Sequence, residues 1–440
     1  MKGICYPMDK LWIRGGKPLV GQVRIGGAKN AALPLMAASL LTEATLVLSN
    51  LPRVSDIVTM KELLIELGVE VVRGEQSDGE ATQDDSETSS LLSLSAAALA
   101  TRKAPYDLVR KMRASILVLG PMLARTGQAS VSMPGGCAIG PRPVDLHLVG
   151  LRQLGAEISL RDGYIEAIAP SGLTGASIFL PSASVGATEN LMMAASLATG
   201  ETTISNAARE PEIFDLAQCL IKMGADITGA GTETVQIKGV ARLNGAEHEV
   251  LPDRIESGTY AIAAAITRGS VDLLGTQLNL FQGLANKLGE AGVRIAALKD
   301  KVRVEFLGDR LAGVDIETRP YPGFPTDMQA QMMALLTVAN GTSHLTENIF
   351  ENRFMHVTEL ARMGADISVK GNVATVQGVE CLRGAPVMAT DLRASVSLLL
   401  AGLVAHGETF VNRVYHLDRG YERIEEKLCG CGASVERLPS

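Results

Sequence analysis

Apolar residues along this chain recur in helical stretches that each end at a glycine. The glycine is followed by Ala or Val and then by a short alternating strand, as in Leu154-Gly155-Ala156. Gly fits the end of a helix because it takes the left-handed backbone conformation at little cost. The pattern predicts six similar helices, which end at Gly68, Gly155, Gly224, Gly292, Gly364 and Gly432.

These six glycines recur 87, 69, 68, 72 and 68 residues apart, which indicates an internal repeat. A second helix, rich in Ala, Leu and Met, precedes each of them and is followed by another strand. Each unit is therefore helix, strand, helix, strand, with extra strands in the linking segments. Six such units predict an α/β fold with two domains of three units. The alternative is chance recurrence of common Leu-Gly pairs, which the regular spacing disfavours. The second helices end at Gly127, Gly200, Gly269, Gly341 and Gly407, with Glu43 in the equivalent place of the first unit.

The long first interval contains a polar insertion, residues 75–90, with six acidic residues and neither Lys nor Arg. Such a segment buries too little apolar surface to offset the entropy lost on ordering. We expect an acidic surface insertion that is solvated or disordered.

Composition excludes several classes of protein. With 41 basic and 48 acidic residues the net charge is −7, so the chain lacks the basic character of nucleic-acid-binding proteins. No apolar run reaches the ~18 residues of a membrane span, and residues 1–7 lack the apolar core of a signal peptide. The six cysteines show neither CxxC nor metal-ligand spacing, which favours reduced thiols. We expect a cytoplasmic protein without nucleic-acid or membrane partners.

The apolar helices begin at polar or charged residues. Free N–H groups and the positive end of the helix dipole make helix starts suitable for phosphate and carboxylate ligands. If the six units are arranged alike, their starts would converge on one cleft. The residues at these starts are Lys29 and Asn30, Arg113, Ser184 to Gly186, Glu256 and Ser257, Asp327, and Asp391 with Arg393.

A Gly- and Pro-rich loop, residues 134–143, places Cys137 five residues before Arg142. Gly and Pro exclude a helix here, and the Walker P-loop pattern is absent. A loop cysteine is more often incidental than catalytic, although a neighbouring guanidinium favours the reactive thiolate. Taken alone, the loop leaves both interpretations open.

Together these motifs resemble the enolpyruvyl transferases that act on UDP-N-acetylglucosamine. The resemblance covers nearly the whole chain apart from residues 1–7 and the insertion. The segments that carry it are residues 26–34 (GGAKNAALP), 112–115 (MRAS), 136–145 (GCAIGPRPVD), 184–188 (SVGAT), 209–212 (REPE), 321–327 (YPGFPTD), 350–354 (FENRF), 390–393 (TDLR) and 418–423 (DRGYER).

The resemblance implies an inside-out α/β barrel in each domain, with the helices inside and the strands outside. One domain is discontinuous and contains residues 1–28 and 252–440, whereas the other covers residues 29–251. Asp327, Arg393 and Arg419 fall in the first domain, and Arg113 and the Cys137 loop in the second.

The reaction implied is the first committed step of peptidoglycan synthesis. The sugar 3′-hydroxyl adds to C2 of phosphoenolpyruvate while C3 gains a proton, and phosphate then leaves the tetrahedral intermediate. This chemistry needs an acid, a base and cations for the substrate anions. By the resemblance, Cys137 is the general acid and can form an adduct with phosphoenolpyruvate, and Asp327 is the base. The alternative for Asp327 is a helix N-cap.

The resemblance also assigns the substrate contacts. Arg suits such sites because its planar fork matches carboxylates and phosphates; the alternative for each Arg or Lys is an ordinary surface salt bridge. The residues implied for phosphoenolpyruvate are Lys29, Asn30, Arg142, Arg393 and Arg419. Those implied for UDP-N-acetylglucosamine are Arg113, Arg142, Pro143, Val144, Asp145, Leu146, Ser184, Val185, Gly186, Asp327 and Ile349.

His147 follows the Cys137 loop, but it lies at the start of an expected helix, where capping or packing fits better than a Cys–His dyad. No HExxH or other metal pattern occurs, and the resemblance implies neither metal nor cofactor. Two alternative functions remain: an enolpyruvyl transferase for shikimate 3-phosphate, and a non-catalytic protein that binds sugar nucleotides. The Cys137 loop disfavours the first, and Cys137 together with Asp327 and the cations disfavours the second.

Overall fold

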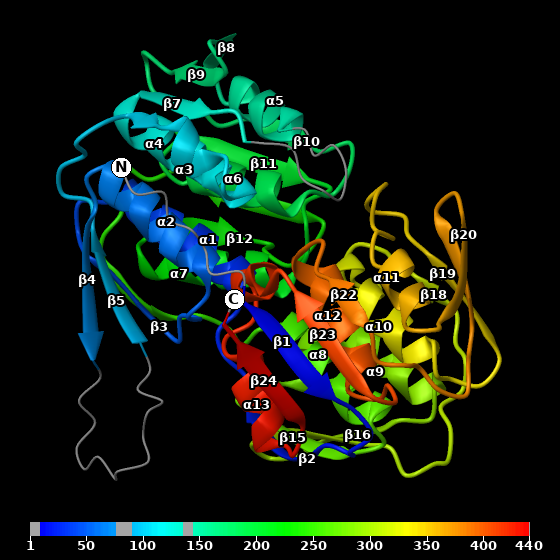
Figure 1. Cartoon of the computed structure of the whole chain (residues 1–440). Helices are drawn as coiled ribbons and strands as arrows, with labels where there is room; N and C mark the ends of the chain where they lie inside the picture. Colours follow the sequence, from blue (N-terminus) through cyan, green and yellow to red (C-terminus); the bar gives the residue numbers. More distant parts are fainter. Residues whose placement is uncertain (1–8, 76–89, 135–143, 440) are drawn as a thin grey trace. The chain divides into compact units, whose positions relative to one another are not determined.

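The computed structural model describes residues 9–75, 90–134 and 144–439. Contacts divide this part of the chain into two compact units, each described here by itself (Figure 1). The central unit contains residues 27–134 and 144–251, and the terminal unit contains residues 9–26 and 252–439. Within these described ranges, no helix is both long and apolar enough to cross a membrane.

In the part of the chain that the structure describes, six four-stranded sheets share one topology, which confirms the sixfold repeat. In each sheet an edge strand runs parallel to its neighbour, and the next two strands continue the sheet antiparallel. For example, β14 is parallel to β3, β3 is antiparallel to β5, and β5 is antiparallel to β4. Each unit contains three of these sheets.

The sheets of the central unit have the following strands, in spatial order: β14 (Ala246–Glu249), β3 (Leu46–Ser49), β5 (Ser90–Ser95) and β4 (Glu70–Glu75); β6 (Lys103–Ala104), β7 (Gln128–Ser132), β9 (Tyr164–Ile168) and β8 (Glu157–Arg161); β10 (Ser177–Phe179), β11 (Glu201–Ser205), β13 (Thr234–Lys238) and β12 (Asp226–Thr228).

The sheets of the terminal unit are, in the same order: β2 (Val20–Arg24), β15 (Ser270–Leu274), β17 (Lys301–Glu305) and β16 (Arg294–Ala297); β18 (Ile316–Glu317), β19 (Thr342–Thr346), β21 (Val373–Gln377) and β20 (Asp366–Lys370); β22 (Pro386–Met388), β23 (Glu408–Asn412), β1 (Lys10–Arg14) and β24 (Ser434–Leu438).

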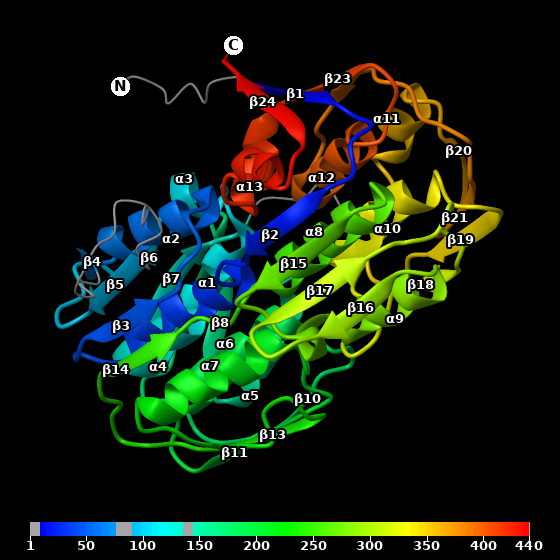
Figure 2. The ribbon, with the colours of Figure 1, turned by 90° about the horizontal axis from the view of Figure 1, so that it is seen from below.

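The first two strands of the chain complete sheets of the terminal unit. β1 lies between β23 and β24, where Leu11 is paired with Val411 on one side and Arg437 on the other (Figure 1). β2 lies parallel to β15, with Val23 opposite Leu273 (Figure 2). β1 therefore joins the two ends of the sequence in one sheet, whereas β2 joins the start of the chain to a sheet built from residues 270–305.

One helix of each repeat is apolar nearly all round and lies buried inside its unit, as expected for a helix without a polar face. In α6, for instance, nine consecutive residues from Ala187 to Ala195 are buried. The sheets lie outside these helices, so the prediction of an inside-out α/β barrel is confirmed. The buried helices are α1 (Lys29–Ala38), α4 (Leu119–Thr126) and α6 (Val185–Ala195) in the central unit, and α8 (Arg254–Ile266), α10 (Gln329–Leu336) and α12 (Leu392–Gly402) in the terminal unit.

The other helix of each repeat is amphipathic and has an exposed face. Each of these helices is followed by its expected glycine in a left-handed conformation, with φ between 92° and 106°. They are α2 (Ser55–Glu66), α5 (Asp145–Gln153), α7 (Pro211–Lys222), α9 (Gln282–Glu290), α11 (Val357–Arg362) and α13 (Ile424–Gly430). Shorter helical turns are η1 (Ser39–Leu41), α3 (Tyr106–Val109), η2 (Arg113–Val118), η3 (Leu278–Phe281), η4 (Thr326–Met328) and η5 (Val414–Arg419).

Two details differ from the simple sequence pattern. After α8 the left-handed residue is Arg268, with φ of 55°, and Gly269 serves instead for close approach, because a Cβ there would lie 2.0 Å from the carbonyl oxygen of Leu19. In the region of the acidic insertion, Glu75 and Ser90 are the last paired residues of β4 and β5. The rest of the insertion, residues 76–89, lies outside the described residues.

Candidate active site

The candidate site residues from the sequence fall in both units, and each group is described within its own unit. Cys137, Arg142 and Pro143 lie outside the described residues. The central unit carries Lys29, Asn30, Arg113, Val144 to Leu146 and Ser184 to Gly186, and the terminal unit carries Asp327, Ile349, Arg393 and Arg419.

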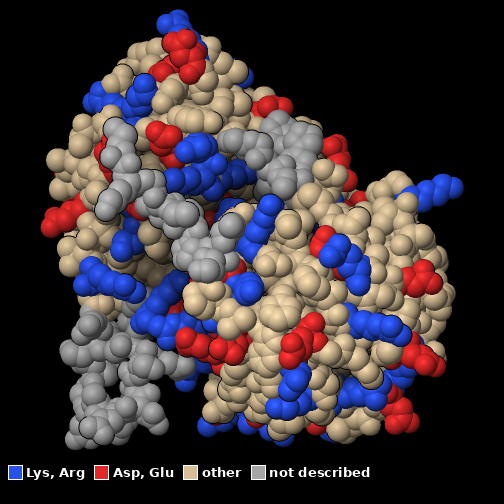
Figure 3. All heavy atoms as spheres, viewed as in Figure 1, with Lys and Arg blue, Asp and Glu red and all other residues tan. Residues whose placement is uncertain are grey.

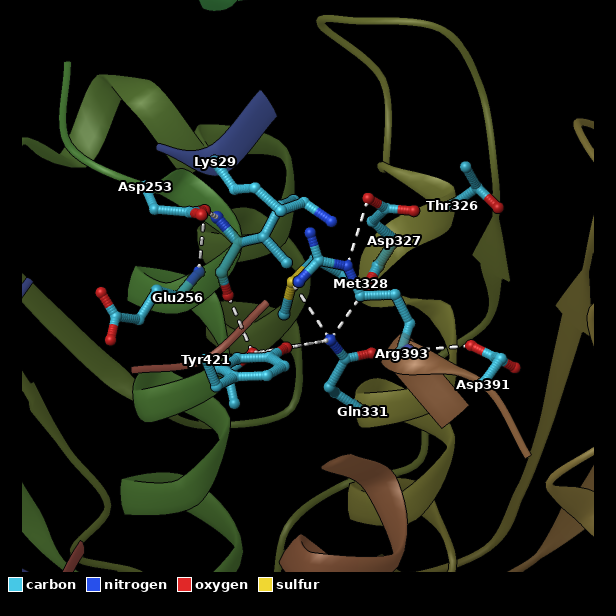
Figure 4. Close-up of polar contacts among 12 residues, drawn as sticks. Lys29, Asp253, Glu256, Thr326, Asp327, Met328, Gln331, Asp391, Arg393 and Tyr421 are labelled. Carbon is cyan, nitrogen blue, oxygen red and sulfur yellow. Dashed lines mark hydrogen bonds and ion pairs between the residues drawn. The ribbon is translucent and has the colours of Figure 1, made fainter. Parts of the chain in front are cut away.

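Asp327 forms ion pairs with two buried arginines of the terminal unit. Its Oδ1 lies 2.7 Å from Nη2 of Arg353. Its Oδ2 lies 3.3 Å from Nε of Arg393 (Figure 4). The residue that precedes η4 is Pro325, and no side chain caps η4 or the following α10. The N-cap interpretation of Asp327 is therefore wrong, because its carboxylate forms ion pairs with the two arginines instead of capping a helix.

Arg393 is a buried cation, with 3% of its surface exposed. Burial is the largest effect and acts to lower its pKa, but the charges of Asp327 and Asp253 and the contributions of Tyr421 together outweigh it. The pKa of Arg393 is therefore raised, and the side chain stays protonated. Among the described residues its Nη1 is buried without a hydrogen-bond partner. Because a buried unpaired donor is costly, this nitrogen suits an anionic ligand.

A network of uncharged polar groups supports the pair of Asp327 and Arg393 (Figure 4). Nε2 of Gln331 donates to the backbone oxygen of Asp327 at 2.9 Å and to the Tyr421 hydroxyl at 3.3 Å. The Tyr421 hydroxyl also lies 2.9 Å from Oγ1 of Thr259, and its ring faces the Arg393 guanidinium at 5.6 Å. Burial raises the pKa of Tyr421, so its phenol is neutral and available as a hydrogen-bond partner.

Asp391 fixes the start of α12 and thereby the backbone of Arg393. Its Oδ1 accepts hydrogen bonds from the N–H groups of Arg393 at 2.8 Å and Ala394 at 3.0 Å. These bonds make Asp391 the N-cap of the helix.

Arg419 ends η5 and is half-buried. The preceding residue, Asp418, receives two hydrogen bonds from the guanidinium of Arg437, at 2.6 and 3.1 Å. This bidentate contact joins η5 to β24 and so holds the segment that carries Arg419.

Lys29 is the first residue of α1 and is also buried. Its Nζ lies 3.1 Å from Oδ2 of Asp56, and both side chains are 7% exposed. Acidic and basic side chains are mixed over the visible surface of the terminal unit (Figure 3), but Lys29 and Arg393 do not belong to such surface pairs. The surface salt-bridge alternative is wrong for these two residues.

The predicted sugar-nucleotide residues of the central unit lie at helix starts. Ser184 is the N-cap of α6 and accepts the N–H of Ala187 at 3.4 Å. Buried Val144 precedes α5, whose first turn contains exposed Asp145 and half-buried Leu146. Arg113 begins η2 and is half-buried. These positions present backbone N–H groups of helix first turns, which suit an anion.

His147 lies near the start of α5 and its side chain is buried, as expected from the sequence. It is 4% exposed, and its Nδ1 lies 3.0 Å from Nδ2 of Asn190. A Cβ at Gly186 would lie 3.3 Å from the His147 ring, so glycine lets the first turn of α6 approach this ring closely. In the described part of the chain, no group of three or more His, Cys, Asp or Glu side chains is placed to hold a metal ion.

The family model for EPSP synthase (3-phosphoshikimate 1-carboxyvinyltransferase) matches residues 13–428. The chain belongs to the enolpyruvyl transferase family. This enolpyruvyl transferase is 60% identical over 432 residues to the UDP-N-acetylglucosamine 1-carboxyvinyltransferase of Rhodospirillum centenum, with 98% of this chain and 99% of the relative covered.

Solved structures of other enolpyruvyl transferases share the fold. The enolpyruvyl transferase NikO from Streptomyces tendae matches with a TM-score of 0.87 and 26% identity, covering 99% of this chain and 100% of its own. EPSP synthase from Acinetobacter baumannii matches with a TM-score of 0.73 and 18% identity, covering 98% and 100%. The six sheets around buried helices are thus the enolpyruvyl transferase fold.

Sequence reasoning missed the role of Arg353 in this enolpyruvyl transferase. The residue stands in the segment Phe350–Phe354 that contributed to the resemblance, but no partner was predicted for it. Its partner Asp327 lies 26 positions away in the sequence. The two flanking aromatic residues give no clear sign of this burial, because Glu351 also lies between Phe350 and Phe354 and is exposed.

Proposed function

We infer that the chain is a UDP-N-acetylglucosamine 1-carboxyvinyltransferase. It transfers the enolpyruvyl group of phosphoenolpyruvate to the 3′-hydroxyl of UDP-N-acetylglucosamine and releases phosphate, in the first committed step of peptidoglycan synthesis. The observation that carries this inference is the 60% identity to a protein of that name over nearly the full length of both chains. The shikimate 3-phosphate alternative has weaker support, because the EPSP synthase from Acinetobacter baumannii is only 18% identical.

In this proposal Asp327 is the base that accepts the proton of the sugar hydroxyl. Two guanidinium groups and the Gln331 network hold the residue in η4, just before α10. Fixed orientation is what a general base requires, because proton transfer depends on hydrogen-bond geometry.

The anionic groups of phosphoenolpyruvate would bind the cations Lys29, Arg142, Arg393 and Arg419, together with Asn30. The support for Arg393 is its buried Nη1, which has no hydrogen-bond partner among the described residues and which a phosphate or carboxylate oxygen would satisfy. For Lys29 the support is a buried ammonium group at a helix start.

UDP-N-acetylglucosamine would bind the helix starts of the central unit and two residues of the terminal unit. Free N–H groups at the starts of α5 and α6 are suited to its pyrophosphate. The proposed contacts are Arg113, Arg142, Pro143, Val144, Asp145, Leu146, Ser184, Val185 and Gly186, with Asp327 and Ile349.

Cys137 would act as the general acid that protonates C3, and it would be the target of the epoxide fosfomycin. The protein contains its own control for an alkylation test: burial raises the pKa of the Cys219 thiol to about 12, so this thiol is inert. We expect mass spectrometry to find one fosfomycin adduct, on Cys137. An adduct on exposed Cys381 or Cys429 instead would contradict the assignment.

We also propose that the discontinuous domain of residues 1–28 and 252–440 and the domain of residues 29–251 act together, because the proposed acid and base lie in different domains. The enzyme would work in the cytoplasm without a cofactor or metal. The test is release of phosphate from phosphoenolpyruvate with each acceptor. Turnover with UDP-N-acetylglucosamine supports the proposal, whereas turnover only with shikimate 3-phosphate, or none, contradicts it.

A further inference from the structure

One buried carboxylate of the terminal unit has no part in the function described above. Glu347 directly follows β19 and is 3% exposed. Within the described residues it forms hydrogen bonds but no ion pair with Lys or Arg. A buried carboxylate costs free energy unless hydrogen bonds compensate it, so its contacts indicate what it holds in place.

Four donors surround this carboxylate. Its Oε1 accepts the backbone N–H groups of Ile349 at 2.8 Å and Phe350 at 3.1 Å, and the hydroxyl of Thr318 at 2.9 Å. Its Oε2 accepts the hydroxyl of Thr326 at 2.9 Å. The donors come from three separate places: the end of β18, the first residue of η4, and the loop after β19.

The strand register explains why these groups meet. β18 and β19 are parallel neighbours, with Glu317 opposite Thr346, so Thr318 and Glu347 follow the same edge of the sheet. The backbone is fixed there as well, since Thr318 N–H donates to the Thr346 oxygen at 2.9 Å. Thr318 Oγ1 also accepts the N–H of Asn348 at 2.9 Å, which ties the start of the loop to the strand.

Glu347 contacts two segments that carry residues of the proposed site. Thr326 directly precedes Asp327 (Figure 4), and the loop that begins at Asn348 carries Ile349 and Arg353. Arg353 returns to Asp327 through the 2.7 Å ion pair. The segment of the base and the loop of its partner are therefore joined twice, once by this ion pair and once by Glu347.

We propose that Glu347 is a positioning residue that sets Asp327 and the Ile349 loop for the reaction. This inference rests on the proposed function, and it adds a residue that touches neither substrate. Thr326 transmits the position of Glu347 to Asp327, and the two backbone N–H groups transmit it to Ile349. Loss of the carboxylate thus affects both the chemical step and the affinity for UDP-N-acetylglucosamine, while phosphoenolpyruvate binding changes little.

The decisive pair of variants is Glu347→Ala and Glu347→Gln. Alanine removes all four contacts, and a misplacement of about 1 Å lowers kcat roughly 10- to 100-fold; the KM for UDP-N-acetylglucosamine should also rise. Glutamine keeps an acceptor for the N–H groups, and its amide can donate to Thr326, so kcat should return to within about threefold of wild type. The melting temperature of each variant is measured alongside.

Two threonine variants separate the effect of Glu347 on Asp327 from its effect on the Ile349 loop. Thr326→Val removes only the contact beside Asp327 and should lower kcat about fivefold, whereas Thr318→Val loosens the loop and should act mainly on the KM for UDP-N-acetylglucosamine. Thr202→Val is the matched control: this buried threonine of β11 has a hydroxyl without a partner among the described residues, so activity should not change.

The outcomes distinguish this inference from the proposed function. If the wild-type protein releases no phosphate with UDP-N-acetylglucosamine, the proposed function fails. If the wild type is active and Glu347→Ala has the same kcat and KM values, the positioning role is wrong. It is also wrong if Ala and Gln lower kcat equally with both KM values unchanged and a reduced melting temperature, which is the pattern of a purely structural residue.

Discussion

The two units share their sheet topology but differ in how most of their buried helices start: a carboxylate caps α8 and α12 of the terminal unit, although α10 has no side-chain cap. In the terminal unit, Asp253 caps α8 with bonds of 2.7 and 3.1 Å, and Asp391 caps α12 in the same way. In the central unit, Ala28 precedes α1 without a side-chain cap, and Ser184 makes only a 3.4 Å contact at α6. A carboxylate cap uses the N–H groups and repels an anion, whereas an uncapped start leaves both the N–H groups and the dipole available.

In the function proposed above, this difference means that the two units would bind anions in two ways. In the terminal unit, Arg393 provides the positive charge through a side chain from a capped helix. In the central unit, helix starts themselves present N–H groups, and Lys29 adds a charge. We expect the first arrangement to bind a small anion through guanidinium groups and the second to suit a pyrophosphate that spans several N–H groups.

The strongest way to break the arrangement of the terminal unit is Asp327→Asn. Turnover should fall roughly 10²-fold or more, because the base is lost. The free energy of unfolding should also fall by about 1–3 kcal/mol, because Arg353 and Arg393 lose their charged partner. Steady-state kinetics and denaturant unfolding measure the two effects.

Asp272→Asn is the matched control for this variant. Asp272 also lies between two cations, Lys301 and Arg303, which hold its pKa at about 2, but it belongs to β15 on the outside of the unit. It should lose stability without losing turnover. Equal turnover loss in both variants would show that disturbing the fold, rather than removing a base, explains the result.

Buried His356 should make the terminal unit sensitive to acid. Burial lowers its pKa to about 4, and the positive charge of Arg353 acts in the same direction, although Asp391 opposes both. Because the unfolded state binds this proton first, stability is lost as the pH falls from about 6.5 to 4, by up to about 3 kcal/mol. Denaturant unfolding across this range should show the loss, and His356→Phe should flatten it. An unchanged slope in the variant would mean that other groups cause the loss.

Buried Glu189 should give the central unit the opposite dependence. Burial raises its pKa well above the usual value, with further contributions from Glu212 and Glu210. Its neutral form is therefore favoured in the folded state, and this contribution is lost as the pH rises above about 4.5, the pKa of the unfolded chain. Glu189→Gln should stabilise the protein more at pH 8 than at pH 5, as measured by denaturant unfolding. A variant that is less stable at both pH values would contradict this.

Cap removal should sharpen the comparison between the units. Asp253→Ala should cost about 1–2 kcal/mol of unfolding free energy, whereas Ser184→Ala should cost about 0.5 kcal/mol. Ser184→Ala should instead raise the KM for UDP-N-acetylglucosamine. If Ser184→Ala is the more destabilising change and leaves KM unaltered, the helix starts of the two units do not differ in the way described.

The smallest effect is expected at the acidic insertion, which is found in the central unit. Glu75 and Ser90 already pair at the end of β4 and β5, so an Asn-Gly turn in place of residues 76–89 closes the hairpin. Turnover should stay within about twofold and stability should change little, because loop length contributes weakly. A large loss of either would show that the insertion has a further role.

Much of the fold could be predicted because its repeat shows in local features of the sequence. Gly155 and its five equivalents end their helices through backbone conformation, which needs no knowledge of distant residues. Side-chain partners were harder: Asp327 after Thr326 has the local pattern of a cap, and only the fold brings Arg353 and Arg393 to it. For Glu347, the two N–H donors are neighbours in the sequence, but the hydroxyls of Thr318 and Thr326 lie 29 and 21 positions away, and only the fold brings them to its carboxylate.

The pairing of β1 with β23 and β24 has a consequence for how the protein is made. Roughly 400 residues separate β1 from its partners, so at ribosomal speed the strand waits about 20–80 s for them. The central unit falls within residues 27–251, between these strands in the sequence, and can fold while synthesis continues. Leu11 and Ile13 of β1, which are fully buried in the folded protein, remain without a sheet until then. A nascent chain that stalls before residue 408 would thus contain a folded central unit and an unpaired β1 with exposed apolar side chains. Chaperones bind such exposed apolar segments, and proteases degrade chains that carry them.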